Sequence, residues 1–182
     1  MRKRSTIFLV TAAITSLSAC ITYNTPDYQS SADTLLHLQQ LNVAPVAVAA
    51  ISRPSGVKDD LQCQTQGRVK APGGYANYVD AALRTELAKA KLLDNNAAIQ
   101  LTGSLQKMTF NSWNNSWQMA LELSSSNGQK LKTETTYRGE ALSLEEETSC
   151  HLVAQSMSVA VQQLLQQALT SDDFTTLLQP IP

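Results

Sequence analysis

The sequence is poor in the groups that mark enzymes and nucleic-acid-binding proteins. It holds only two histidines, His37 and His151, and neither lies near a Gly-x-Ser-x-Gly elbow, so nucleophilic catalysis lacks its usual base. No spacing of His, Cys, Asp or Glu fits a metal site, and no glycine-rich phosphate loop is present. The net charge is −1, so no basic patch indicates nucleic acid. We therefore expect a non-enzyme that uses no cofactor, binds no metal and does not contact nucleic acid.

The sequence also lacks an apolar run long enough to cross a membrane. Residues 7–17 carry no charge, but they fall short of the about 20 apolar residues that a transmembrane helix needs. Basic residues at positions 2–4 precede the run, and small residues follow it. This order is typical of a secretory signal peptide.

Leu17-Ser18-Ala19-Cys20 ends the apolar run. These four residues resemble the lipobox of bacterial lipoproteins. The resemblance implies that residues 1–19 are a lipoprotein signal peptide, that cleavage occurs before Cys20, and that the Cys20 sulfur is diacylated, which anchors the chain to the membrane. Ile21 rather than Asp follows Cys20, and in enterobacteria-like lipoproteins this favours the outer membrane, facing the periplasm. The alternative is an ordinary signal peptide with a chance cysteine at its border.

Cysteine is scarce, and the lipobox uses one of the three. An exported protein meets an oxidising compartment in which disulfides persist. Cys63 and Cys150 then have a single intramolecular pairing, for which the chain-entropy model gives roughly 4.5 kcal/mol of stabilisation. A redox or metal role is the alternative, but there is no Cys-x-x-Cys, and His151 beside Cys150 is a lone candidate ligand. We predict a Cys63–Cys150 disulfide.

The mature chain divides into a short leader and one domain. Residues 20–41 are predicted to hold the lipidated cysteine, a polar tether over 21–31 and a short helix from about 32 to 40, and residues 42–182 form a single periplasmic domain. The apolar run 43–51 predicts a buried strand. Residues 52–73 are rich in glycine, proline and polar residues and predict a long loop, which is either a contact surface or simply solvated.

Helical periodicity appears twice in the rest of the chain. Apolar residues from Tyr75 to Leu87 predict an amphipathic helix over about 74–91, with Glu86 among the polar residues placed largely on its other faces. A second stripe predicts a helix over about 146–169. The acidic run 145–147 at its start is explained by the helix macrodipole, so we assign it no site.

Three alternating segments separate the two helices. Period-two patterns predict strands near 99–106, 117–123 and 131–137, and Asn127-Gly128 predicts a two-residue hairpin between the last two. Trp113 lies in the turn between the first two strands. It is either a membrane or partner contact, or a ring packed partly on the neighbouring strand.

The element order β-α-β-β-β-α predicts an α+β two-layer domain, with an antiparallel-rich β-sheet and two long helices on one face. Over residues 43–169 this order resembles periplasmic lipoprotein domains of the curli-secretion-protein type, related to the amino-terminal domain of the Tol-Pal β-propeller protein. Cell-wall-synthase activator lipoproteins share it. The resemblance carries over no site residue, and a fold alone does not specify function.

The anchor and the missing active site together predict a function. We expect a non-catalytic, membrane-anchored periplasmic lipoprotein that binds a protein partner or envelope complex. One alternative is a structural component that oligomerises in an envelope export or assembly machine. Another is a binder of cell-wall or lipid ligands.

Overall fold

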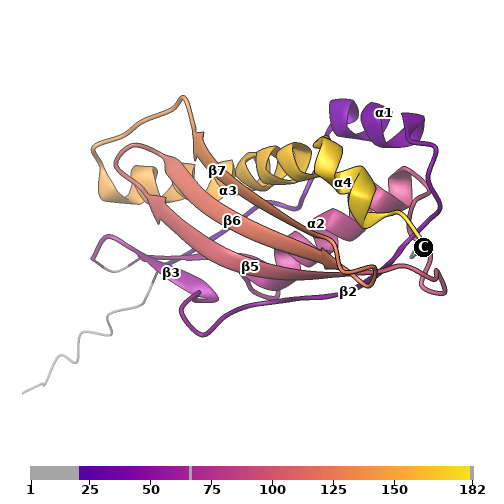
Figure 1. Ribbon diagram of the computed structural model, residues 1–182. Helices are drawn as coiled ribbons and strands as arrows, with labels where there is room; N and C mark the ends of the chain where they lie inside the picture. The colour runs from indigo at the N-terminus through magenta and orange to yellow at the C-terminus, as the bar shows by residue number, and fades with distance from the viewer. Residues whose placement is uncertain (1–20, 66, 181–182) are drawn as a thin grey trace, which may run out of the picture.

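The computed structural model describes residues 21–65 and 67–180, which form one α+β domain (Figure 1). Cys20 and the predicted signal peptide lie outside the described residues. The helices are α1 (Ala32–Gln40), α2 (Tyr75–Lys89), α3 (Glu146–Leu169) and α4 (Asp172–Leu177). The strands are β1 (Ile21–Asn24), β2 (Ala47–Ser52), β3 (Asp60–Cys63), β4 (Gly67–Lys70), β5 (Gln100–Asn111), β6 (Ser116–Ser125) and β7 (Lys130–Arg138).

The larger sheet and the two long helices form the two predicted layers. Its strand order is β2-β5-β6-β7, with β2 parallel to β5 and the remaining pairs antiparallel. Helices α2 and α3 pack on one face, α2 against β2 and β5 and α3 against β6 and β7 (Figure 1). The sequence from β2 to α3 therefore has the predicted β-α-β-β-β-α order, if the short strands β3 and β4 are set aside.

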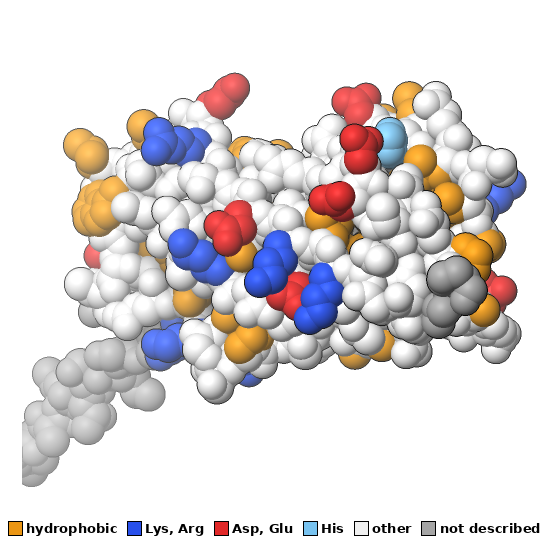
Figure 2. Space-filling view, viewed as in Figure 1, with side chains coloured by type: hydrophobic (Ala, Val, Ile, Leu, Met, Phe, Trp, Pro, Cys, Tyr) orange, Lys and Arg blue, Asp and Glu red, His pale blue; other side chains and the backbone are white. Residues whose placement is uncertain are grey.

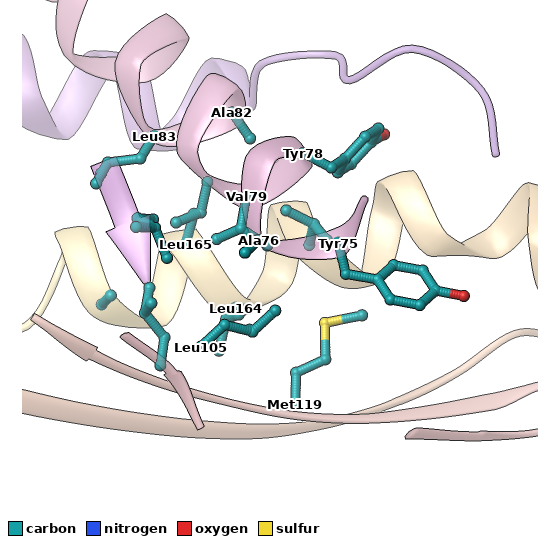
Figure 3. Packing of buried hydrophobic residues seen from close by; sticks show 14 of the residues in the cluster. Tyr75, Ala76, Tyr78, Val79, Ala82, Leu83, Leu105, Met119, Leu164 and Leu165 are labelled. Carbon is teal, nitrogen blue, oxygen red and sulfur yellow. The ribbon is translucent and has the colours of Figure 1, made fainter. Parts of the chain in front are cut away.

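The core lies between these layers. Tyr75 and Leu83 of α2, Leu164 of α3, and Leu105 and Met119 of the sheet meet there, and each is at most 1% exposed (Figure 3). Full burial of one such side chain contributes about 1.5–3 kcal/mol. The periodic apolar stripes of the helices thus pack against the larger sheet.

Strand β5 is longer than the alternation of its sequence indicates. The pattern stops at Gln106, because Gln106 and Lys107 are both exposed. A β-bulge in β5 between Leu105 and Lys107 absorbs one residue. Met108 then returns to the core, and pairing with β6 continues to Asn111.

The β6–β7 hairpin lies where Asn127-Gly128 predicts it, but its turn is longer than two residues. The Ser125 amide donates to the Gln129 carbonyl oxygen at 2.9 Å, and the Gly128 amide donates to Ser125 at 2.9 Å. Gly128 has a φ of 90°, whereas Asn127 stays outside the left-handed region. A single glycine in that region is typical of a three-residue hairpin with a glycine bulge.

A second, smaller sheet corrects two predictions. Strands β3 and β4 lie in the segment predicted as a loop over 52–73, and β1 occupies the first residues of the predicted tether. Their order is β1-β4-β3, with β1 parallel to β4. Each of these strands has four residues, too few to show a clear period of two. Residues 21–24 therefore belong to the folded domain rather than to a tether.

Glu86 is buried rather than placed on an exposed face of α2. Its side chain is 0% exposed because the segment before α1 lies across it. The Tyr28 hydroxyl donates to Glu86 Oε1 at 2.5 Å, and the Ser31 amide donates to the same oxygen at 3.0 Å. Burial and this hydrogen bond raise the pKa of Tyr28. A polar contact thus fixes the N-terminal segment on the helix.

Candidate interaction surfaces

Several turns meet at one end of the domain, at the left of Figure 1. We call this the Trp113 end and define it by Ile21, residues 64–65, residues 112–115 of the β5–β6 turn and residues 139–145 before α3. The disulfide between Cys63 at the end of β3 and Cys150 in α3 ties two of its segments together, with a Cα–Cα distance of 5.9 Å. The predicted pairing of Cys63 with Cys150 is thus present in the structure.

Hydrogen bonds from Gln64 and Thr65 add to that disulfide. Gln64 Nε2 donates to Ser112 Oγ at 3.2 Å and to Ser149 Oγ at 2.9 Å. The Thr65 amide donates to Glu146 Oε1 at 3.0 Å. The β3–β4 turn is therefore attached both to the start of α3 and to the β5–β6 turn.

Asn115 joins the β5–β6 turn to the segment before α3. Its carbonyl oxygen accepts from the Gly139 amide at 2.8 Å, and its Nδ2 donates to the Ala141 carbonyl oxygen at 3.1 Å. Ser156 Oγ donates to its Oδ1 at 2.8 Å. A Cβ atom at position 139 would collide with the Asn115 side chain, so this close approach requires glycine. These loops are positioned by specific contacts.

Large apolar side chains project from this fixed frame. Trp113 is 55% exposed, Leu142 64%, Leu144 89% and Ile21 45%. Figure 2 shows hydrophobic side chains standing out at the left end of the molecule. Ile21 also lines a hollow of about 280 Å³ together with Thr65 and residues of the first turn of α3. Trp113 is thus a surface residue of which about half is exposed.

The open face of the larger sheet is polar instead. Glu122 Oε1 lies 3.3 Å from Lys130 Nζ, and Glu122 Oε2 lies 3.5 Å from Lys132 Nζ. Figure 2 shows red and blue side chains gathered across the face that is viewed there. The hydrogen bond from Lys130 lowers the pKa of Glu122, and the charges of both lysines act in the same direction.

The opposite end, which we call the Asn127 end, comprises residues 126–129, 172–180, 44–45 and 94–99. Asn127 Nδ2 donates to the carbonyl oxygens of Thr176 at 2.9 Å and Gln179 at 2.8 Å. Phe174 and Leu177 of α4 are fully buried. A hollow of about 260 Å³ remains, with mostly apolar walls that include Pro45, Ile99 and Leu178. The sequence pattern offered no signal for the Asn127 contact.

The two histidines of the chain lie apart from each other. His37 is in α1, and His151 is exposed in α3 beside the disulfide. Across residues 21–65 and 67–180 we find no group of three His, Cys, Asp or Glu side chains placed to hold a metal ion. None of the helices in that part of the chain is both long and apolar enough to cross a membrane.

Comparison with known proteins yields similarity of fold. No protein-family model matches this sequence, and neither does any curated protein sequence. Among solved structures, a Xanthomonas campestris protein of the DUF330 family aligns with a TM-score of 0.50 at 8% identity, over 81% of this chain and 94% of that one. A second, uncharacterised protein aligns with a TM-score of 0.43 at 9% identity, over 80% of this chain and 98% of its own. At 8% identity, the similarity to the Xanthomonas campestris protein is one of fold alone and does not indicate a function.

Proposed function

We propose that the protein is a non-catalytic lipoprotein, anchored in the outer membrane through acyl chains on Cys20, whose periplasmic domain binds a protein partner or envelope complex. The proposed anchoring is supported by the sequence Leu17-Ser18-Ala19-Cys20, which is followed directly by a paired strand. A cut before Cys20 would leave β1 intact, because pairing with β4 starts at Ile21. The processing site and the folded domain are therefore compatible.

The open face of the larger sheet supports binding of a protein partner. Except for Ala50 of β2, its exposed side chains are polar or charged, and they stand on a rigid frame of paired strands. Lysines on the edge strand β7, such as Lys130 and Lys132, discourage edge-to-edge pairing with another sheet. The face is thus better suited than the edge to a specific contact. Surfaces of this kind recognise partners by complementary charge.

The anchoring is tested by the intact mass of the mature chain. We expect a chain that begins at Cys20 and carries acyl chains, and a Cys20→Ser variant that leaves the membrane fraction. A mature chain that retains residues before Cys20, or an unmodified Cys20, would contradict the proposal.

Partner binding is tested by photo-cross-linking in cells. A photoreactive residue replacing exposed Gln118 on the open face is expected to give a reproducible adduct with another protein. The same residue at exposed Gln39 of α1 serves as the control and should give none. The reversal Lys132→Glu is expected to weaken the Gln118 adduct. Absence of any adduct from the open face would count against a partner there.

A further inference from the structure

We propose that the Trp113 end docks on the bilayer that holds the acyl chains of Cys20, with Trp113, Leu142 and Leu144 inserted at the lipid–water interface. This inference rests on the proposed lipidation of Cys20. Beyond the anchor itself, it states which surface of the domain touches lipid directly and how the domain is oriented on the membrane.

The first argument is the length of chain between anchor and fold. Consecutive Cα atoms lie about 3.8 Å apart, so a lipidated Cys20 stays within that distance of the Ile21 Cα. Ile21 is already paired with Gly67 of β4. Thr65, close before Gly67, is bonded to Glu146 at the start of α3. The acyl chains would therefore hold this end, and no other, against the membrane surface.

The second argument is the chemistry of the side chains found there. Tryptophan is enriched at membrane–water interfaces, where one part of its ring meets lipid and its N–H meets water. Leu142 and Leu144 are 64% and 89% exposed, which leaves most of their apolar surface in water without a membrane. Exposed apolar side chains gathered in one place mark a site of interaction with lipid or protein.

The third argument is the frame that carries these side chains. Asn115 and Gly139 hold the two loops together, and the disulfide of Cys63 with Cys150 holds the neighbouring turn. Because the loops are fixed before contact, little backbone entropy remains to be lost on docking. The apolar side chains are thus presented together.

The charges around the Trp113 end indicate whether it would contact lipid through headgroup electrostatics or through apolar insertion. Glu140, Glu145 and Glu147 are exposed beside the two leucines, and Arg138 is exposed just before Gly139. Three carboxylates outnumber this one guanidinium, and carboxylates are repelled by anionic headgroups, so we attribute the attraction to apolar insertion. A few side chains bind a membrane weakly by themselves. The acyl anchor on Cys20, one residue before Ile21, would keep the domain next to the bilayer and so give these side chains a high effective concentration there. We expect contact that does not require anionic lipid and is not weakened by salt.

The test uses lipidated, full-length mature protein reconstituted in vesicles of phosphatidylethanolamine and phosphatidylcholine. The chain has two tryptophans, and Trp117 is fully buried, with its indole N–H bonded to the Val153 carbonyl oxygen. Trp117 therefore serves as an internal reference. The difference between the wild type and Trp113→Phe isolates the emission of Trp113. We expect acyl-chain-brominated phosphatidylcholine to quench this emission, equally at low and high salt.

Matched variants show which side chains produce the contact. Leu142→Ser combined with Leu144→Ser should reduce the quenching of Trp113. Leu36→Ser is the control, because Leu36 is 59% exposed on α1, away from the Trp113 end, and the quenching should not change. Emission that brominated lipid leaves unchanged would overturn the docking. Shielding of Trp113 from aqueous iodide without quenching by bromine would also overturn it, because protein would then cover the ring.

The mass of the same sample separates the two proposals. An acylated Cys20 with unquenched Trp113 would refute the docking and leave the lipoprotein assignment standing. An unacylated Cys20 would refute the assignment, and the docking would fall with it.

Discussion

Side-chain hydrogen bonds hold the loops together at both the Trp113 end and the Asn127 end, but the two ends differ in how far their apolar side chains are exposed. At the Asn127 end the amide of Asn127 binds carbonyl oxygens at the end of α4, and Phe174 is fully buried. At the Trp113 end the amide of Asn115 binds a loop carbonyl oxygen, and Trp113 remains 55% exposed. The same kind of contact completes the core at one end and displays apolar side chains at the other. We infer that the Trp113 end contacts an apolar environment.

The largest difference between the two ends is expected when one aromatic ring is truncated at each of them. Phe174→Ala should lower the free energy of unfolding by about 3–5 kcal/mol, because it leaves a cavity in a fully packed region. Trp113→Ala should change it by no more than about 0.5 kcal/mol, as for surface substitutions elsewhere. Urea unfolding of the unlipidated domain measures both. Similar losses for the two variants would show that Trp113 is a structural residue.

Removal of the disulfide should act mainly at the Trp113 end. Cys63→Ala combined with Cys150→Ala should cost about 2–5 kcal/mol, because the bridge closes a long loop in the unfolded chain. Urea unfolding gives the size of the effect. Hydrogen exchange should then increase at residues 64–65 and stay unchanged at residues 126–129. Equal loosening at both ends would contradict the local role of the bridge.

The Asn127 contact should have a smaller effect. Asn127→Ala removes hydrogen bonds to the end of α4 and should cost about 1–2 kcal/mol, because one hydrogen bond contributes about 0.5–1.5 kcal/mol net. The exposed Asn95 at the same end offers a matched control, and Asn95→Ala should have little effect. Thermal unfolding followed by circular dichroism is sufficient. A null result for Asn127→Ala would mean that packing alone holds α4.

Alkaline pH should loosen the segment that runs from β1 to α1. Burial raises the pKa of Tyr28 and of Tyr78 above the ordinary value of 10.0. A raised pKa in the folded state means that the contribution is fully present below about pH 10 and is lost as the pH rises further. Tyr28→Phe should make the decline of stability above pH 10 shallower. An identical decline in the wild type and the variant would exclude Tyr28 as its source.

Leu144→Ser should have the smallest effect on folding. At 89% exposure the side chain contributes little to the core, so the free energy of unfolding should hardly change. The variant should instead reduce self-association of the unlipidated domain, because it removes part of an exposed apolar patch. Light scattering at increasing protein concentration measures this. A large loss of stability would mean that Leu144 is packed in solution.

The sequence predicts the larger layers of this fold well. Helix α3 spans Glu146–Leu169 and α1 spans Ala32–Gln40, at the bounds that their apolar periods and polar starts indicate. The hairpin at Asn127-Gly128 also lies where it is predicted, because a glycine turn is a local signal. Long segments with a clear period carry enough information to be recognised without their neighbours.

The features that sequence reasoning missed depend on distant partners. Strands β1, β3 and β4 are too short to show a pattern and are stabilised by pairing with one another. Glu86 has the position of a surface acid on its helix, and in the structure Tyr28 and Ser31 of the segment before α1 contact it. The sequence raised exposure of Trp113 as one alternative, but it could not place Leu142 and Leu144 beside it. Their grouping depends on Asn115 contacting residues 139 and 141.

Hydrogen–deuterium exchange of the lipidated protein in vesicles, compared with the unlipidated domain in buffer, tests the contrast between the two ends most directly. We predict that vesicles slow exchange at residues 111–115 and 139–145 and leave residues 126–129 and 178–180 unchanged. The open sheet face should also keep its exchange rate in this purified system. Slowed exchange at the Asn127 end, or no change at residues 111–115, would contradict the membrane-facing role of the Trp113 end.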